Sequence, residues 1–161
     1  MRSQGSADKK RKLGILVALL PLLWIVYTFI LNSILLNTES QDGNGSIIRT
    51  LISLGADVNT VDNRRTPLIY AIEQQRIQNA NVLISCGADV NFPERESKIT
   101  PLMVAASYSQ MPVVNLLIRR GADINARDSS GVSVLGWAEK GQAIGFGAEA
   151  VTLLKKLGAV K

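Results

Sequence analysis

The sequence predicts an all-helical repeat solenoid of helix-turn-helix units, preceded by a single N-terminal transmembrane helix. Three observations predict this fold: a charge-free apolar stretch after a basic N-terminus, a five-residue string that recurs at intervals near 33 residues, and a second landmark in phase with it. Apolar residues make up 47% of the 161 residues and aromatic residues only 5%. That composition suits helices that pack through Leu, Ile, Val and Ala.

The first predicted element is a membrane-spanning helix over Leu13–Leu36. This stretch carries no charge, and as a helix its 24 residues would reach about 36 Å, enough to cross a ~30 Å hydrocarbon core. Five basic residues precede it within residues 1–12, whereas the chain just after it holds few charges. The positive-inside rule therefore predicts a cytoplasmic tail at 1–12 and a periplasmic or extracellular location for the rest of the chain.

Two other interpretations of the apolar stretch stay open. A cleaved signal peptide also begins with basic residues, but its apolar core normally runs for about 7–15 residues and ends at a small-x-small site, which is missing from this stretch. Cleavage would release a secreted module. A buried core helix is the third interpretation, and the length and flanking charge of the stretch disfavour it.

After a predicted linker at 37–45, an internal repeat fills residues 46–161. The string Gly-Ala-Asp-Val/Ile-Asn begins at Gly55, Gly87 and Gly121, with a degenerate copy at Gly158. The landmark Thr-Pro-Leu begins at Thr66 and Thr100, with a degenerate form at Ser133. A fixed period with two phased landmarks is typical of a solenoid whose units stack on their neighbours.

Each landmark has a local physical cause. The threonine hydroxyl caps a helix N-terminus, and the proline after it takes the first helical position, where no N–H is needed. Gly87 and Gly121 are expected in the left-handed conformation that ends a helix. Asp57, Asp89 and Asp123 recur one unit apart, too far for acid–base pairing, so we expect them to have structural roles in turns.

The two phased landmarks resemble those of the ankyrin-repeat family, over about residues 46–161. The compact repeats are similar to those of bacterial ankyrin proteins. We assign a half repeat to 46–61 and full repeats to about 62–94, 95–127 and 128–161. Ile69, Met103 and Gly136 replace the family's usual histidine after Thr-Pro-Leu. Gly141–Gly147 adds four residues to the last repeat and is predicted to be a loop between its helices rather than a phosphate site.

Composition excludes several kinds of chemistry. The chain has no histidine and a single cysteine, Cys86, which excludes Ser-His-Asp and Cys-His triads, histidine metal sites and an intrachain disulfide. Residues 37–161 carry 13 Lys and Arg against 12 Asp and Glu, so a nucleic-acid partner is not expected. We also expect no enzyme activity, no cofactor and no metal.

The resemblance implies a module that binds a protein partner on the concave surface of the stack, while Leu13–Leu36 contacts the lipid bilayer. The family's variable positions map onto Asp62, Asn63, Arg65, Glu73, Gln74, Glu96, Ser97, Ile99, Ser107, Tyr108, Ser129, Ser130, Val132 and Lys140. Tyr and Arg are enriched at binding hot spots, so Arg65 and Tyr108, flanked by an exposed Ile99, are the expected anchors. Trp137 is expected to pack within the last repeat.

An alternative function is an accessory redox or stress-protection role that acts through Cys86. This residue directly precedes Gly87, in the last turn of a predicted helix. The helix dipole disfavours a thiolate at that end, so the sequence predicts an inert, partly exposed thiol.

Overall fold

The computed structural model describes residues 20–21, 23–28, 30–32, 34, 45–61, 65–146 and 148–160. Within these ranges the chain forms helices, turns, loops and an isolated antiparallel bridge between Arg127 and Ser133. The predicted cytoplasmic tail at 1–12, most of the linker at 37–45 and part of the Leu13–Leu36 segment lie outside the described residues.

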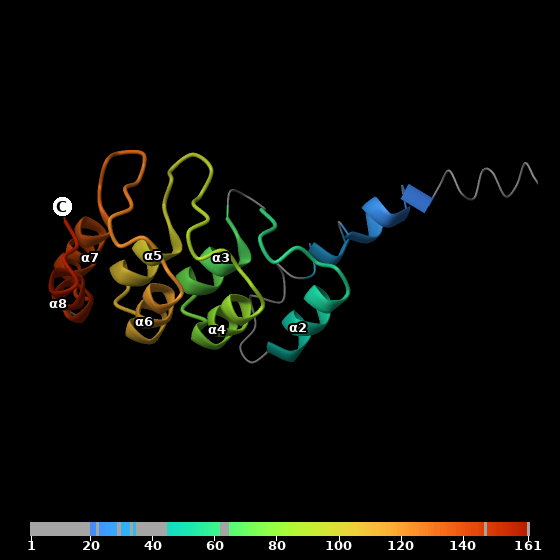
Figure 1. Ribbon diagram of the computed structural model, residues 1–161, viewed down its shortest axis with the longest axis horizontal. Coiled ribbons are helices and arrows are strands. Elements are labelled where there is room, and N and C mark those ends of the chain that lie inside the picture. The colour runs from blue at the N-terminus through green and yellow to red at the C-terminus, as the bar shows by residue number, and fades with distance from the viewer. Residues whose placement is uncertain are drawn as a thin grey trace, which may run out of the picture.

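The helices stack in two rows (Figure 1). The inner row contains α3 (Pro67–Glu73), α5 (Pro101–Ser107) and α7 (Val134–Ala143), and the outer row contains α2 (Gly45–Ser53), α4 (Ile77–Ser85), α6 (Met111–Arg119) and α8 (Glu149–Lys156). Neighbouring helices pack against each other along each row, and α3–α4, α5–α6 and α7–α8 are packed pairs. The prediction of an all-helical repeat stack is confirmed.

The inner helices begin where the Thr-Pro-Leu landmark predicts. The hydroxyl oxygens of Thr66, Thr100 and Ser133 accept hydrogen bonds from backbone N–H groups three residues later, at 3.3, 3.4 and 3.3 Å. In α5 the side chain of Met103 completes the cap, because its sulfur lies 3.5 Å from the backbone nitrogen of Thr100. Each cap satisfies a donor that the first helical turn leaves unpaired.

The outer helices end at the predicted glycines. Gly87 follows α4 with φ of 93° and Gly121 follows α6 with φ of 86°, a conformation that L side chains rarely adopt. A left-handed residue also stands between the two helices of each pair. It is Gln75 in the first pair, Ser109 in the second and Gly145 in the third.

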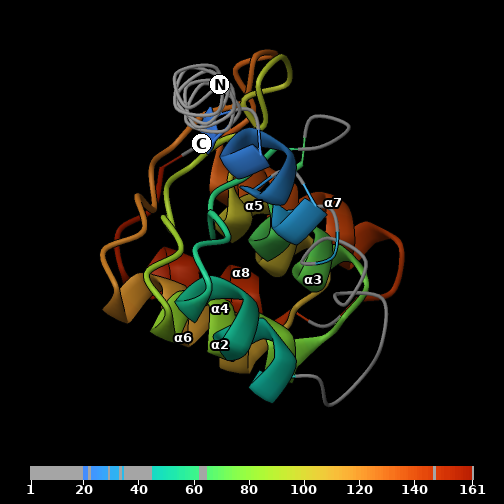
Figure 2. The ribbon, with the colours of Figure 1, turned by 90° about the vertical axis from the view of Figure 1, so that its right-hand side faces the viewer.

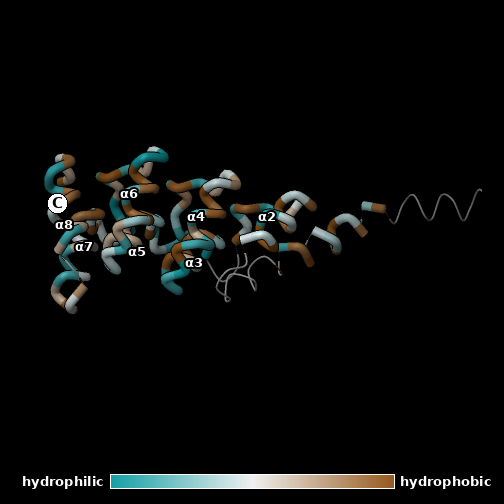
Figure 3. The backbone as a smooth tube through the Cα atoms, turned by 90° about the horizontal axis from the view of Figure 1, so that it is seen from below, coloured by the Kyte–Doolittle hydropathy of each residue, from teal (hydrophilic) through white to brown (hydrophobic). Residues whose placement is uncertain are grey.

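The hydrophobic core lies between the two rows. Ile72, Leu83, Leu102, Leu117 and Leu154 are among its largest side chains, and each is less than 2% exposed. Figure 3 shows hydrophobic and hydrophilic residues alternating along the helices, as expected for helices that each bury one face. Because each pair covers the core of the next, the stack holds together through neighbour contacts.

The described residues that connect an outer helix to the next inner helix are 54–61 with 65–66, 86–100 and 120–133, and we call these three connections fingers. The fingers project on the side of the inner row (Figures 1 and 2). We call the surface formed by the fingers and by α3, α5 and α7 the inner face.

The last pair departs from the prediction in one place. The stretch Gly141–Gly147 was expected to be a loop, but α7 continues through Gly141 to Ala143. Gly141 is buried against the end of α5, and a Cβ on it would lie 1.9 Å from the carbonyl oxygen of Ser107. The helix can therefore continue through Gly141, because glycine leaves room for the backbone of Ser107. Sequence spacing alone does not predict this contact.

The described residues between 20 and 34 are helical and mostly exposed. Thr28 and Asn32 are partly buried, and Leu31 is buried at 5% exposure and belongs to the core of the stack. Within the part of the chain that the structure describes, no helix has both the length and the apolar character needed to cross a membrane.

Candidate functional site

The fingers are held in shape by the Asp-x-Asn segment of each repeat. The carboxylate oxygen Oδ1 of Asp57, Asp89 and Asp123 accepts a hydrogen bond from the backbone N–H two residues later, at 2.9, 2.8 and 2.8 Å. This is an Asx turn, in which a side chain replaces a backbone acceptor. The predicted structural role of the three aspartates is confirmed.

The asparagine of the same segment joins one finger to the next. Oδ1 of Asn59 accepts a hydrogen bond from the backbone N–H of Asp89 at 2.8 Å. Oδ1 of Asn91 accepts one from the backbone N–H of Asp123 at 2.9 Å. The Nδ2 group of Asn91 also donates to the carbonyl oxygen of Gly121 at 2.9 Å. These bonds fix the spacing between fingers, and therefore the spacing of groups on the inner face.

These bonds from one asparagine to the next finger form a ladder, and the ladder extends to both ends of the stack. At the C-terminal end, Oδ1 of Asn125 accepts from the backbone N–H of Val160 at 3.1 Å. At the N-terminal end, Oδ1 of Asn32 accepts from that of Asp57 at 2.9 Å. Asn32 belongs to the segment predicted to cross the membrane, so the ladder ties that segment to the first finger.

The structure places most of the fourteen predicted partner-binding residues on the inner face, although Asp62 and Asn63 lie outside the described residues. The exposed members are Arg65, Gln74, Glu96, Ser129, Ser130 and Lys140. The partly buried members are Glu73, Ser97, Ile99, Ser107, Tyr108 and Val132. The exposed members lie on fingers or at the ends of inner helices, where a partner could contact them without unfolding the stack.

Arg65 lies at the centre of a charged group on the inner face. Its Nη1 is 2.8 Å from Oε2 of Glu73 on α3, and its Nε is 3.5 Å from Oε1 of Glu94 on the second finger. Burial raises the pKa of Glu73 above its ordinary value, with Arg65 opposing the shift and Glu94 adding to it. Arg65 therefore joins two repeats, and sequence pattern alone did not predict its two carboxylate partners.

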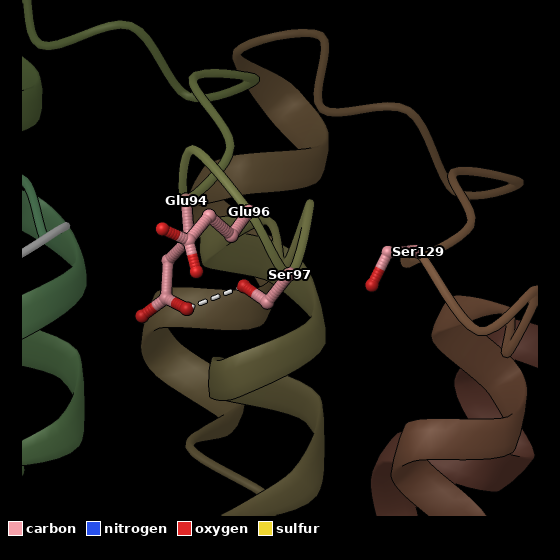
Figure 4. A pocket seen from close by; sticks show the side chains of 4 residues that line it. All are labelled: Glu94, Glu96, Ser97 and Ser129. Carbon is pink, nitrogen blue, oxygen red and sulfur yellow. Dashed lines mark hydrogen bonds between the residues drawn. The ribbon is translucent and has the colours of Figure 1, made fainter.

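Glu94 also lines an open pocket of about 270 Å³ between the second and third fingers, together with Glu96, Ser97 and Ser129 (Figure 4). The hydroxyl of Ser97 donates to the carboxylate of Glu94. The backbone N–H of Ser129 donates to the carbonyl oxygen of Ser97 at 2.7 Å, which holds the two fingers side by side. The pocket is polar and acidic, so it suits a cationic group of a partner.

Two expected anchors are less accessible than predicted. Ile99 and Tyr108 are partly buried and pack against the core, so the expectation that they are exposed is corrected. The ring of Tyr108 meets that of Phe146 edge-to-face, with centroids 5.4 Å apart and an interplanar angle of 84°. Phe146 reaches this ring from the insertion of the last repeat, a long-range contact that the local pattern does not encode.

The tip of the third finger is organised by Asp128, which the sequence did not single out. Its Oδ1 accepts from the backbone N–H groups of Ser130 and Val132, and its Oδ2 accepts from Nε1 of Trp137, all at 2.9 Å. Burial acts to raise the pKa of Asp128, but these hydrogen bonds and the nearby Lys140 outweigh it and hold the pKa below its ordinary value. Trp137 packs against the core, as predicted.

Cys86 is the C-cap residue of α4 and is partly exposed, as predicted. Nη1 of Arg49 lies 4.0 Å from its sulfur. Among the described residues, no three or more Cys, Asp and Glu side chains gather closely enough to hold a metal ion. A redox role for Cys86 stays a hypothesis, and labelling of the native thiol is its direct test.

Comparison with protein-family models gives two matches. The model described as ankyrin repeats (3 copies) matches residues 32–94, and the model described as ankyrin repeat matches residues 97–129. Together the matches cover more than half of the chain. The first match begins at residue 32, whose side chain starts the asparagine ladder. A comparison with curated proteins gives no match.

Proposed function

Because the chain belongs to the ankyrin-repeat family, we propose that it is a protein-interaction module tethered to a membrane by its N-terminal apolar segment. The observation that carries the proposal is the combination of a stacked inner face with an exposed apolar helix in one chain. Ankyrin repeats imply a protein partner, and solenoids use such extended surfaces for binding. We propose a binding role without catalysis, since the chain has no histidine and its one thiol lies at the end of a helix.

The proposed tether rests on exposed apolar side chains in the described part of the N-terminal segment. Leu20, Leu23, Trp24, Ile25, Val26, Tyr27, Ile30 and Ile34 are between 41% and 67% exposed. A soluble monomer rarely leaves so much contiguous apolar surface uncovered, and such a surface marks a protein or membrane contact. The charge-free sequence of the segment favours the hydrocarbon core of a bilayer.

The proposed partner site is the inner face between the first and third fingers. Arg65, Glu94 and Glu96 offer charged groups of both signs within two adjacent fingers. The ladder bonds hold those fingers at fixed spacing, so little conformational entropy is lost on binding. A partner segment with a cationic group for the acidic pocket would fit this surface.

Site-specific photo-crosslinking in cells tests the partner site. A photoreactive amino acid at Gln74 or Glu96, both exposed on the inner face, should trap the same partner band. The matched control is Asn115, which is also exposed but lies on α6 of the outer row. Adducts at Asn115 that equal those at Glu96, or the absence of adducts at both inner positions, would contradict an inner-face site.

Paired reporter fusions at the C-terminus test the tether and its orientation. A reporter that works only outside the cytoplasm should be active, which would correspond to a periplasmic location in a bacterium, and one that works only in the cytoplasm should be silent. The reverse pattern would show that the stack faces the cytoplasm. Recovery of the full chain in the soluble fraction would contradict the tether itself.

A further inference from the structure

We propose that the N-terminal end of the stack is itself part of the membrane contact, so that the first repeat lies in the headgroup layer of the bilayer. This inference rests on the proposed tether. The surface concerned consists of Tyr27, Ile47, Leu54 and Val61, and we call it the N-terminal end surface. Its proposed occupant is the lipid bilayer.

The first step of the argument is that the apolar helix enters the stack directly. Leu31 is 5% exposed within the core, and Asn32 is bonded to the first finger through Asp57 at 2.9 Å. Both residues lie in the apolar segment Leu13–Leu36. The stack therefore begins inside that segment, with no polar linker between the apolar helix and the first packed residues.

The second step concerns length. With Leu31 held in the stack, residues 13–30 remain to span the bilayer, and 18 residues in a helix would reach about 27 Å. That is shorter than the ~30 Å hydrocarbon core, so such a helix crosses only where the bilayer thins and only if its end lies at the edge of the core. A stack that starts at Leu31 is thereby drawn against the interface.

The third step is that the adjoining part of the stack exposes apolar side chains. Ile47, Leu54 and Val61 are 44%, 51% and 41% exposed. Leu54 directly follows the last residue of α2, and its backbone N–H still donates to the carbonyl oxygen of Thr50 at 3.0 Å, so a separation of seven residues, about two helical turns, places it on the same side as Ile47. The hydroxyl of Tyr27 donates to the carbonyl oxygen of Leu54 at 3.5 Å, which makes this surface continuous with the apolar helix.

The fourth step concerns the chemistry of the junction. Trp24 and Tyr27 are 67% and 45% exposed, and their amphipathic rings belong to the residue types enriched at the membrane–water interface. α2 carries one basic residue, Arg49, and no acidic residue, so it brings no negative charge against the lipid headgroups. Tyr27 lies about one helical turn before Leu31, so an interface at the level of its ring places α2 and the first finger beside the headgroups.

The experiment measures the lipid exposure of single labels on the full chain. Cys86→Ser removes the native thiol, and single cysteines at Ile47, Leu54 or Val61 carry an environment-sensitive fluorophore after reconstitution into phosphatidylcholine–phosphatidylglycerol vesicles. Vesicles that contain nitroxide-labelled lipids supply the quencher. Position Leu23 is the control for the apolar helix, and Ile144, 74% exposed on the last repeat, is the matched aqueous control.

We expect quenching and a blue-shifted emission at Ile47, Leu54 and Val61, weaker than at Leu23, and neither effect at Ile144. Quenching at Leu23 together with none at Ile47, Leu54 or Val61 would overturn this inference and leave the tether intact. No quenching at Leu23 would defeat the tether as well. A blue shift at position 54 that depends on the protein concentration and not on the amount of nitroxide-labelled lipid would indicate that a second copy of the chain covers this surface. That result would also overturn the inference.

Discussion

The side-chain oxygen of Asn32 accepts a hydrogen bond from the backbone N–H of Asp57, in the same way that the side-chain oxygen of Asn59 accepts one from the backbone N–H of Asp89. Asn32 is not part of a Gly-Ala-Asp-Val/Ile-Asn string, yet it occupies the first place in the ladder that those strings build. The functional consequence is continuity: every finger, including the first, is fixed by an asparagine from the preceding unit. A partner on the inner face therefore meets a surface whose spacing is set before binding.

Removing one asparagine of the ladder should weaken the stack. Asn91→Ala deletes an acceptor for Asp123 and a donor to Gly121, two bonds between repeats. At a net value of about 0.5–1.5 kcal/mol for each bond, the free energy of unfolding should fall by about 1–3 kcal/mol. Urea denaturation of the wild type and the variant measures this difference in the free energy of unfolding. Asn115→Ala, exposed on α6, is the matched control and should change stability by less than about 0.5 kcal/mol.

Gly141→Ala should destabilise the stack by forcing two inner helices apart. The added methyl group would stand 1.9 Å from the carbonyl oxygen of Ser107, so the backbones of α7 and α5 must separate. Overpacking of this kind costs about 1–3 kcal/mol, and a backbone clash places the loss at the upper end of that range. A Cβ at Gly136 in the same helix would meet side chains and no backbone, Val132 at 2.9 Å and Ser133 at 3.8 Å, so Gly136→Ala should cost less. Equal losses in thermal melts of the two variants would contradict this account.

Helix caps and helix ends could be predicted from the sequence because they depend on neighbouring residues. Contacts between residues far apart in the sequence could not be predicted in this way. Thr66 and Thr100 cap helices, and Gly87 ends one, because those roles depend on neighbours within a few residues. The burial of Tyr108 was missed because Phe146 comes from the next repeat. The network of Asp128 was missed for a related reason, since its partner Trp137 lies beyond the finger.

Ser109→Gly should stabilise the protein. Ser109 has φ of 50°, a left-handed conformation that costs a side-chain-bearing residue about 1–2 kcal/mol, and Gly145 occupies the corresponding place in the last repeat. Because glycine also gains freedom in the unfolded chain, a net gain of about 1 kcal/mol is expected. Ser107→Gly in the last turn of α5 is the control and should destabilise. A chemical denaturation midpoint that fails to rise for Ser109→Gly would refute the assignment of strain.

Leu102→Ala and Tyr108→Ala should separate the core from the partner site. Leu102 is 1% exposed, and its truncation should lower the free energy of unfolding by about 2–5 kcal/mol. Tyr108 is partly buried, and the loss of its edge-to-face contact with Phe146 should lower the free energy of unfolding by about 0.5–1.5 kcal/mol in addition to the apolar burial that the truncation removes. As an anchor, Tyr108 should also lose about 2 kcal/mol or more of binding free energy on truncation.

A circular-dichroism melt beside a partner-capture assay distinguishes the two roles. Tyr108→Phe keeps the ring contact with Phe146, so it should retain the melting temperature and report on the hydroxyl alone. Should Tyr108→Ala melt the domain as Leu102→Ala does, Tyr108 is a core residue. Unchanged capture by a folded Arg65→Ala, Tyr108→Ala double variant would remove both residues from the partner site.

The carboxylate of Asp128 should give the third finger an acid-sensitive component of stability. Hydrogen bonds from Val132, Trp137 and Ser130 hold the pKa of Asp128 below its ordinary value. Its ionised form therefore adds stability above the ordinary carboxyl pKa of about 4, and that contribution is lost as the pH falls through the lower pKa of the folded state. The contribution of Glu73 to stability has the opposite pH dependence, because its pKa is raised in the folded state. Stability therefore declines as the pH rises from the ordinary pKa of this carboxyl towards its pKa in the folded protein.

The Asp128→Asn variant isolates this contribution. Denaturation at several pH values should show wild type more stable than Asp128→Asn near neutral pH, with the difference shrinking as the pH drops below about 4. In a Trp24→Phe background, the fluorescence of Trp137 should follow the same titration, since its Nε1 donates to the carboxylate at 2.9 Å. A difference between wild type and Asp128→Asn that stays constant from neutral to strongly acidic pH would show that the hydrogen bonds to Asp128 do not depend on its charge.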